Sequence, residues 1–114
     1  MTDELKKNAK VLLSELPEDL TERLSEILQG EGYQVTALPS SDHFKQLLSD
    51  TFFNLIILYR SAPRENEEDL LRYVKGRYPS TLVIIVSDNG CLEEAIECIR
   101  QGAYDYLSWP IEPG

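Results

Sequence analysis

The residues of this chain that could take part in chemistry follow directly after its apolar stretches. Glu15, Tyr59, Ser87 and Asp88 each stand within two residues of the end of such a stretch. Carboxylates at such positions can hold a hard cation or act as bases, and hydroxyls can act as nucleophiles. A tyrosine hydroxyl has a reference pKa of about 10, and no histidine stands beside Tyr59 to take its proton. The set therefore offers isolated carboxylates and hydroxyls.

The elements that would position these residues begin with three continuous apolar runs, residues 11–13, 55–58 and 82–86. Strands that are buried on both faces have this character, because neither face alternates with polar residues. Two weaker strand candidates, residues 33–37 and 104–108, each follow a glycine-containing turn. The sequence therefore predicts five strands.

Between the runs, apolar residues recur at helical spacing, so four helices are expected to alternate with the strands. The first is expected to begin near Pro17, with Glu18 and Asp19 at the positive end of its dipole. The third is expected to begin at Asn66 as its N-cap. The side chains expected to face the core are Leu20, Leu24, Ile27 and Leu28; Phe44, Leu47 and Leu48; Leu70, Leu71 and Val74; and Leu92, Ala95, Ile96 and Ile99.

Strict alternation of strands and helices predicts right-handed crossovers and a parallel sheet that is covered on both sides, a three-layer α/β sandwich. In such folds the functional crevice lies at the carboxyl ends of the strands, where the winding of the chain reverses. The residues expected at this edge are 14–16, 59–60, 87–88 and 108–109.

Four segments carry a family resemblance: Lys10-Val-Leu-Leu13, Phe53-Asn-Leu-Ile-Ile-Leu58, Val83-Ile-Ile-Val-Ser87 and Gly102-Ala-Tyr-Asp-Tyr-Leu107. Together they resemble the receiver domains of two-component response regulators, and the match covers nearly the whole chain. The resemblance implies a five-stranded parallel sheet of order 2-1-3-4-5, as in flavodoxin-like folds. It also implies a signalling module that is not an enzyme. The cytoplasm is the expected compartment, on the sequence features given below.

In that family an acidic pair closes the first strand, a phosphoryl-accepting aspartate the third, a threonine or serine the fourth, and a lysine before a proline the fifth. Only part of this set is present here. The corresponding positions are Glu15 and Leu16, Tyr59, Ser87 and Trp109, with Tyr106 at the family's aromatic switch position.

Phosphoryl transfer to a carboxylate needs a nucleophile, a Mg²⁺ ion held by oxygen ligands and a fixed cation near the phosphate. Leu16 cannot coordinate a hard cation, and Glu15 alone supplies one carboxylate. We therefore expect no metal and no cofactor, and a degenerate receiver that works through protein contacts. Two alternatives remain open: a receiver phosphorylated at an unorthodox residue, and a small-molecule sensor that uses the crevice. Against the sensor, the segment after the first strand, residues 15–18, has no glycine-rich phosphate loop.

The two large aromatic residues at family positions, Tyr59 and Trp109, would make the crevice apolar. Aromatic side chains anchor many protein interfaces, so Tyr59, Trp109, Tyr104 and Tyr106 could form a partner surface. Packing into the core is the other interpretation, and the sequence leaves both open. The resemblance also implies a cis peptide bond before Pro110.

The chain has eleven basic and twenty acidic residues, which gives a net charge of −9. This charge opposes binding to nucleic acid or to an anionic membrane. No apolar run approaches the roughly 18 residues of a membrane span, and the first residues do not resemble a signal peptide.

Cys91 and Cys98 lie seven residues apart in one expected helix, which separates their Cα atoms by about 10 Å, too far for a disulfide. Both are expected to be buried thiols, and His43 to be solvated or to cap a helix.

The last residues, 112–114, are typical of the start of another helix. Residues 1–114 are therefore expected to form a single receiver-like domain that stops before its last helix, or one whose open face is covered by a second copy. The run 102–107 followed by Pro110-Ile-Glu-Pro113 is similar to receivers of enhancer-binding (sigma-54-type) transcriptional activators of the AAA+ class. This implies that the partner is a protein or the chain's own transcriptional output domain.

Overall fold

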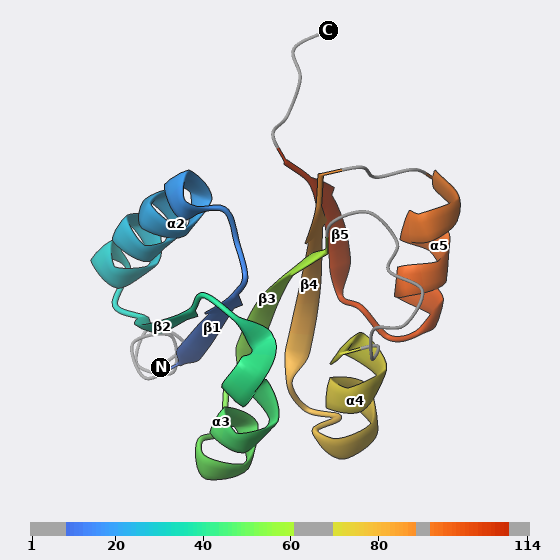
Figure 1. The fold of residues 1–114 in the computed structure, drawn as a ribbon, viewed down its shortest axis with the longest axis horizontal. Helices are drawn as coiled ribbons and strands as arrows, with labels where there is room; N and C mark the ends of the chain where they lie inside the picture. Colours follow the sequence, from blue (N-terminus) through green and yellow to red (C-terminus); the bar gives the residue numbers. More distant parts are fainter. Residues whose placement is uncertain (1–8, 61–69, 89–91, 110–114) are drawn as a thin grey trace, which may run out of the picture.

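A computed structural model describes residues 9–60, 70–88 and 92–109 (Figure 1). Its elements alternate along the chain as the sequence predicts, and each of the five predicted strands is confirmed to within a few residues. In chain order they are β1 (Lys10–Ser14), α2 (Glu18–Gly30), β2 (Gln34–Leu38), the 3-10 helix η1 (Ser41–His43), α3 (Phe44–Asp50), β3 (Leu55–Arg60), α4 (Leu70–Arg77), β4 (Leu82–Ser87), α5 (Leu92–Arg100) and β5 (Asp105–Ser108).

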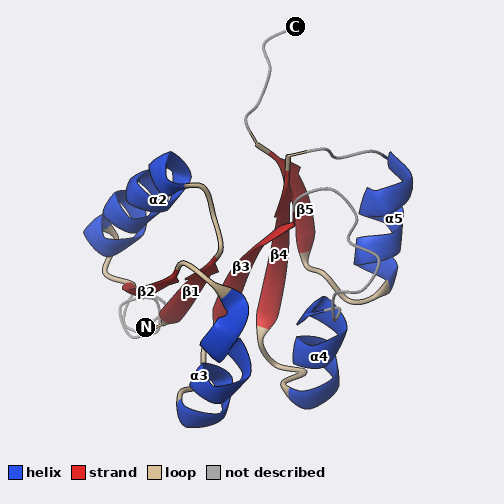
Figure 2. Ribbon diagram, viewed as in Figure 1, coloured by secondary structure: helices blue, strands red, loops and turns tan. Residues whose placement is uncertain are grey.

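The five strands form one parallel sheet in the order β2-β1-β3-β4-β5. Helices lie on both sides of it, which confirms the three-layer sandwich (Figure 2). Because successive side chains of a strand point to opposite faces, each central strand contributes to two separate cores. The order reverses at β1, as in other doubly wound sheets.

The larger core lies between the sheet and the helices α3, α4 and α5. Its buried members include Phe44 of α3, Val74 of α4 and Cys98 of α5, packed on Ile56 and Ile85 of the strands. The smaller core lies beneath α2 and contains Leu20 together with Val11, Leu13, Ile57 and Val86. Helix α2 therefore covers one face by itself among the described residues.

Helix α2 begins one residue after Pro17, whose carbonyl accepts the Thr21 N–H at 2.8 Å. It ends at Gly30, and the chain turns into β2 through Gly32, which has φ +96°. Leu20 is buried as predicted, but Ile27 is 59% exposed. The prediction for Ile27 was wrong because α2 contacts the sheet along a narrower stripe than the sequence pattern indicated.

Helix α5 also differs from the sequence prediction. Leu92, Ile96 and Ile99, which were expected to face the core, are 72%, 45% and 48% exposed, and Cys98 is buried instead. The Tyr106 ring packs against the core on this side of the sheet. A small side chain lets a helix approach a ring closely, and Cys98 is the residue of α5 that is buried in this core.

One part of the α2 face is open. Leu82 of β4 and Leu107 of β5 are 43% and 48% exposed, on the face that the alternation of their strands assigns to the smaller core. This apolar strip is the one that the sequence analysis expected a last helix or a second copy to cover. What covers it stays a prediction.

Several sequence predictions concern residues outside the described ranges: the N-cap at Asn66, the burial of Cys91 and the peptide bond before Pro110. Cys98 is confirmed as a buried free thiol. His43 is exposed and precedes α3 without a capping hydrogen bond from its side chain. No helix within the described ranges is long and apolar enough to cross a membrane.

Candidate functional site

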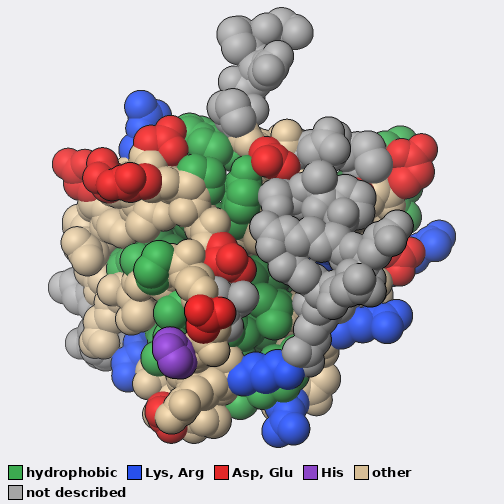
Figure 3. Space-filling view, in the orientation of Figure 1, with side chains coloured by type: hydrophobic (Ala, Val, Ile, Leu, Met, Phe, Trp, Pro, Cys, Tyr) green, Lys and Arg blue, Asp and Glu red, His purple; other side chains and the backbone are tan. Residues whose placement is uncertain are grey.

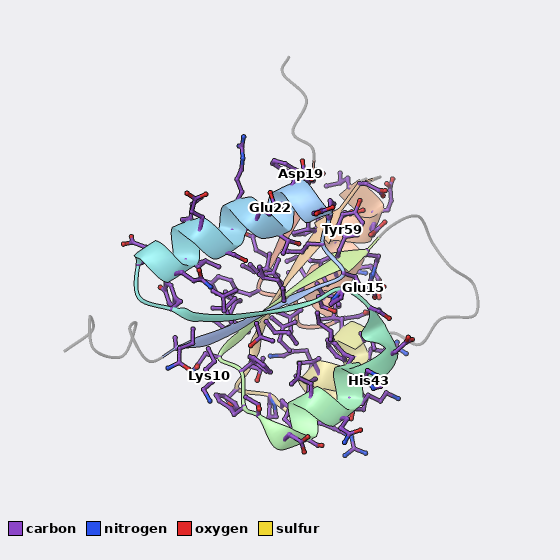
Figure 4. All side chains as sticks on the ribbon, turned by 60° about the vertical axis from the view of Figure 1, so that its left-hand side comes forward. Lys10, Glu15, Asp19, Glu22, His43 and Tyr59 are labelled. Atoms are coloured by element: carbon purple, nitrogen blue, oxygen red, sulfur yellow. The ribbon has the colours of Figure 1, made fainter. Side chains whose placement is uncertain are left out.

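The structure brings the carboxyl ends of the strands together at one edge of the sheet. In the register of the sheet, Arg60 of β3 lies opposite Ser87 of β4, and Ser87 lies opposite Ser108 of β5. The Trp109 N–H donates to the Ser87 carbonyl at 2.9 Å, which continues this pairing by one residue. Figure 4 shows Glu15 and Tyr59 near the start of α2, where Asp19 lies. The edge predicted from sequence is therefore the candidate site.

Glu15 has an unusual backbone conformation at this edge. Its φ is +60°, in the left-handed region that costs a residue with a side chain about 1–2 kcal/mol. The Glu15 N–H donates to the Leu38 carbonyl at 2.8 Å, which holds the turn against β2. The next residue, Leu16, is half-buried and packs against the smaller core. The two residues that the sequence analysis compared with the family's acidic pair are thus one carboxylate and one side chain that packs on the core.

Tyr59 is half-buried and packs against the smaller core on the α2 side of the sheet. Burial raises the pKa of Tyr59 above its ordinary value of 10.0, and a hydrogen bond to the Asp88 carboxylate and the charge of Asp88 raise it further. The phenol is therefore neutral at physiological pH. A neutral phenol is a poor nucleophile.

Strand alternation separates the candidate residues into two groups. Tyr59 and Trp109 pack on the core beneath α2, whereas Tyr106 packs on the core beneath α5. Tyr104 lies at the opposite end of β5, where its N–H donates to the Val83 carbonyl at 2.7 Å, and it is 66% exposed. The structure brings Tyr59 and Trp109 to one face, and it does not gather all four aromatic residues into one surface.

A second polar group lies on the α5 side of the same edge. The Arg60 guanidinium Nη1 donates to the Cys98 Sγ of α5 at 3.2 Å. The Tyr106 hydroxyl is buried and has no well-oriented hydrogen bond with the described residues. Burial is the main cause that raises the pKa of Tyr106; the charge of Glu94 adds to it, and Ser87 acts in the opposite direction. Tyr106, Ser87 and Glu94 therefore lie close together.

The sequence analysis identified Ser87 and Tyr106 but missed Glu94 and the contact between Arg60 and Cys98. The signal for Arg60 was available, because neighbours on a strand point to opposite faces and Arg60 must point away from Tyr59. The signal for Glu94 was weaker, since its partial burial depends on the rotation of α5 about its own axis.

The described residues bring no large group of metal-binding side chains together. Within the described ranges no three or more His, Cys, Asp or Glu side chains lie close enough together to hold a metal. Mg²⁺ requires several oxygen ligands in near-octahedral geometry. At this edge Leu16 has no oxygen in its side chain, while Glu15 and Asp88 carry carboxylates.

Comparisons with known proteins agree with this geometry. Residues 11–114 match the family described as "Response regulator receiver domain". The chain is 36% identical over 104 residues to response regulator protein FleR of Pseudomonas aeruginosa, which covers 91% of this chain and 22% of FleR. It is 27% identical over 107 residues to the alginate biosynthesis transcriptional regulatory protein AlgB of the same species, covering 94% of this chain and 24% of AlgB.

Among solved structures, the beryllofluoride-activated NtrC4 receiver domain dimer matches with a TM-score of 0.79 and 27% identity, covering 90% of this chain and 85% of that one. The present chain spans less than a quarter of the length of FleR or AlgB. Because the family match extends over nearly all of the chain and the sheet order is the one expected, this chain belongs to the response regulator receiver domain family.

Proposed function

We propose that this chain is a receiver domain that regulates its response regulator through protein contacts, without aspartyl phosphorylation. One observation carries the proposal: near the end of β3, where the resemblance places the family's acceptor aspartate, stands Tyr59, which is half-buried against the smaller core. A neutral phenol packed in this way is suited to holding the edge of the sheet closed.

The surrounding residues support the same proposal. Transfer of a phosphoryl group requires a metal ion and a cation that neutralise the developing charge. The lysine position holds Trp109, which is half-buried against the smaller core, and the acidic-pair position holds Leu16. Three substitutions at one edge each remove a different requirement of the reaction.

A contact surface is available on α5. Leu92, Ile96 and Ile99 recur at i, i+4 and i+7, so they form one exposed apolar stripe along the helix, here called the α5 stripe. Exposed apolar side chains that are contiguous mark interaction sites more often than isolated ones do. We infer that the regulatory contact is made through this stripe.

The occupant that fits the α5 stripe best is a second copy of the chain. Glu93 and Glu97 are exposed on α5 near its beginning and middle, and Arg100 is exposed at its end. An antiparallel pair of α5 helices related by a twofold axis would bring the acidic beginning of each helix near the Arg100 of the other. The similarity to NtrC4, whose receiver domain was solved as a dimer, supports this choice.

The output of the whole protein is proposed to be transcription. AlgB is named a transcriptional regulatory protein, and its similarity to this chain extends over 94% of this chain. The net charge of −9 favours protein partners over direct DNA contact. In Figure 3 acidic side chains gather over α2 and basic ones near α4, so the charge is unevenly distributed over the surface.

The first test is incubation of the chain with acetyl phosphate and Mg²⁺, followed by intact mass measurement. We expect no mass increase, with the NtrC4 receiver treated in parallel as the positive control. A gain of one phosphoryl group that disappears in Tyr59→Phe would establish the alternative, a receiver phosphorylated at an unorthodox residue.

The second test is sedimentation equilibrium of the wild type and of two matched serine variants. Ile96→Ser lies at the centre of the α5 stripe, and Ile27→Ser removes an equally exposed isoleucine from α2. We expect a concentration-dependent dimer in the wild type and Ile27→Ser, and a monomer in Ile96→Ser. A wild type that stays monomeric at high concentration would contradict the second copy as the occupant.

A further inference from the structure

We propose that the outer surface of α3 and α4 binds the acidic outer stripe of α2 of a second copy of this chain. The contact is separate from the α5 stripe, and it would add a head-to-tail association to the pairing of α5 helices. It goes beyond the proposed function because it assigns a role to two charged surfaces that neither the crevice nor α5 uses.

The basic surface is formed by two helices around one aromatic ring. The Lys45 Nζ of α3 lies 4.7 Å from the centre of the Tyr73 ring of α4, and the Arg77 Cζ lies 5.3 Å from the same centre. The Tyr78 ring lies 6.5 Å from the Tyr73 ring, centre to centre, in edge-to-face geometry. These four residues are here called the α3–α4 patch. Tyrosine and arginine are among the residue types that carry most of the binding energy of protein interfaces.

The α3–α4 patch is positively charged on a chain that is acidic as a whole. Helix α4 has three basic residues and no carboxylate. The acidic residues nearest to Lys45 in sequence are Asp42, before α3, and Asp50, at its end. In Figure 3 basic side chains lie together over α4. A surface of this sign favours a partner with negative charge.

The complementary surface lies on α2. Glu18, Glu22 and Glu26 recur every four residues and are exposed, so they form one acidic stripe along the helix. The single basic residue of α2, Arg23, is on the neighbouring stripe. Like charges four residues apart destabilise a helix, and a cationic partner would offset this repulsion. Successive members of the acidic stripe are about 6 Å apart along the axis, so two of them can face the two cations of one patch.

The two surfaces lie on opposite faces of the sheet. Helix α2 packs on the smaller core, whereas α3 and α4 pack on the larger core on the other side (Figure 2). One copy therefore cannot bring its own two surfaces together, but two copies can, when the α2 face of one stacks on the α3–α4 patch of the next. Because the two contacting surfaces differ, the association is head-to-tail.

The net charge of −9 on each copy gives this contact a characteristic salt dependence. At about 0.01 M salt the screening length is about 30 Å, so whole copies repel one another. At about 0.15 M salt it is about 8 Å, which screens the long-range repulsion while paired charges in contact still attract. At about 1 M salt it is about 3 Å, and the paired charges are screened as well.

The experiment is sedimentation equilibrium of the chain in an Ile96→Ser background, which removes the contact through the α5 stripe. We expect association at about 0.15 M NaCl and much weaker association at about 0.01 M and about 1 M. The α5 stripe itself is tested at about 1 M NaCl, where an apolar contact persists and Ile96→Ser is expected to be monomeric. Failure of one contact is therefore distinguishable from failure of the other.

Charge reversal identifies the residues. In the Ile96→Ser background, Arg77→Glu and Glu22→Lys should each weaken self-association at least about tenfold, because each places like charges opposite one another. Arg100→Glu and Glu31→Lys are the matched controls, since they make the same changes of charge at exposed sites outside both surfaces. Both controls should associate as the parent does.

Mixing the two charge-reversal variants tests the contact without depending on either variant alone. Arg77→Glu keeps an intact acidic stripe, and Glu22→Lys keeps an intact α3–α4 patch. An equimolar mixture should therefore associate at the strength of the parent, although each variant by itself does not. A mixture that stays monomeric, or reversal variants that associate as well as their controls, would overturn the inference.

A different occupant would give a different result. If the Ile96→Ser chain stayed monomeric at about 1 mM in about 0.15 M NaCl, the second copy would be wrong. Binding of a poly-L-glutamate peptide that is lost in Arg77→Glu would then show that the patch takes an acidic segment of another protein.

Discussion

Tyr59 of β3 and Trp109, which follows β5, pack against the same core beneath α2, so aromatic side chains of the protein itself occupy this side of the crevice. A tyrosine at the end of β3 leaves this edge less polar than a carboxylate there would. The predictions below address the chemistry of this edge and the packing that supports it.

Stability is expected to fall at alkaline pH. The pKa values of Tyr59 and Tyr106 are both raised above 10.0 in the folded chain, with burial as the main cause. A group whose pKa is raised on folding contributes stability below its unfolded pKa, and this contribution is lost as the pH rises through the folded value. Urea denaturation between pH 9 and pH 11, as rough limits set by the reference value, should show a decline above about pH 10. The decline should be smaller in Tyr59→Phe and Tyr106→Phe.

Phosphorylation should return only when the missing groups are restored together. We expect the triple variant Leu16→Asp, Tyr59→Asp and Trp109→Lys to gain one phosphoryl group from acetyl phosphate and Mg²⁺, because it regains a second carboxylate, a nucleophile and a cation. Tyr59→Asp alone should react far more slowly, since the metal and the cation are still missing. Intact mass measurement over time separates the two, and equal rates would show that the other two positions are unimportant.

Gly102 and Gly76 offer a matched pair for testing the turn before β5. Gly102 has φ +106°, and a Cβ there would lie 3.1 Å from the Lys75 Cγ. Lys75 is held in place by donating to the carbonyls of Pro79 and Thr81 at 3.0 and 2.9 Å. Gly102→Ala should therefore lower the free energy of unfolding by about 1–3 kcal/mol.

Gly76 lies in α4, with nothing within 4 Å of a built Cβ. Gly76→Ala should leave stability unchanged or raise it by up to about 1 kcal/mol, because alanine favours the helix. Urea midpoints for the two variants provide the measurement. A stable Gly102→Ala would mean that the turn adjusts freely.

Trp109→Ala should lower stability by about 2 kcal/mol, since the half-buried ring packs against the smaller core. Its effect on self-association through the α5 stripe should be small, because Trp109 and α5 lie on different faces of the sheet. Urea denaturation and sedimentation of the same variant test the two statements. If Trp109→Ala lost the dimer but kept the stability of the wild type, Trp109 would instead be part of the interface.

The sheet could be predicted from sequence because its strands are continuous apolar runs between glycine-rich turns. Residues 55–58 and 82–86 indicate central strands, because a run that is apolar on both faces must be buried on both. The edge of the sheet followed from topology, and the strand-end residues Glu15, Tyr59, Ser87 and Trp109 all lie there.

The orientation of α5 could not be predicted, because two stripes of the helix compete for the sheet. The aliphatic stripe has more apolar area, and hydropathy alone favours its burial. The stripe that contains Ala95 and Cys98 is smaller and allows closer approach beside Tyr106. Which stripe of α5 faces the sheet depends on the size of a neighbouring ring. That ring belongs to the tertiary structure and cannot be read from the local sequence pattern. The contact between Arg60 and Cys98, 38 residues apart, was missed for the same reason.

Trp109 is the single tryptophan of the chain, and it stands on the same face of the sheet as Tyr59. Its fluorescence is therefore an unmixed optical signal from the crevice. Any ligand or partner that enters there, and any loss of the surrounding packing, should shift the emission without the need for an attached dye. Because Trp109 follows β5 directly, binding at this edge of the sheet can be titrated in solution by its emission.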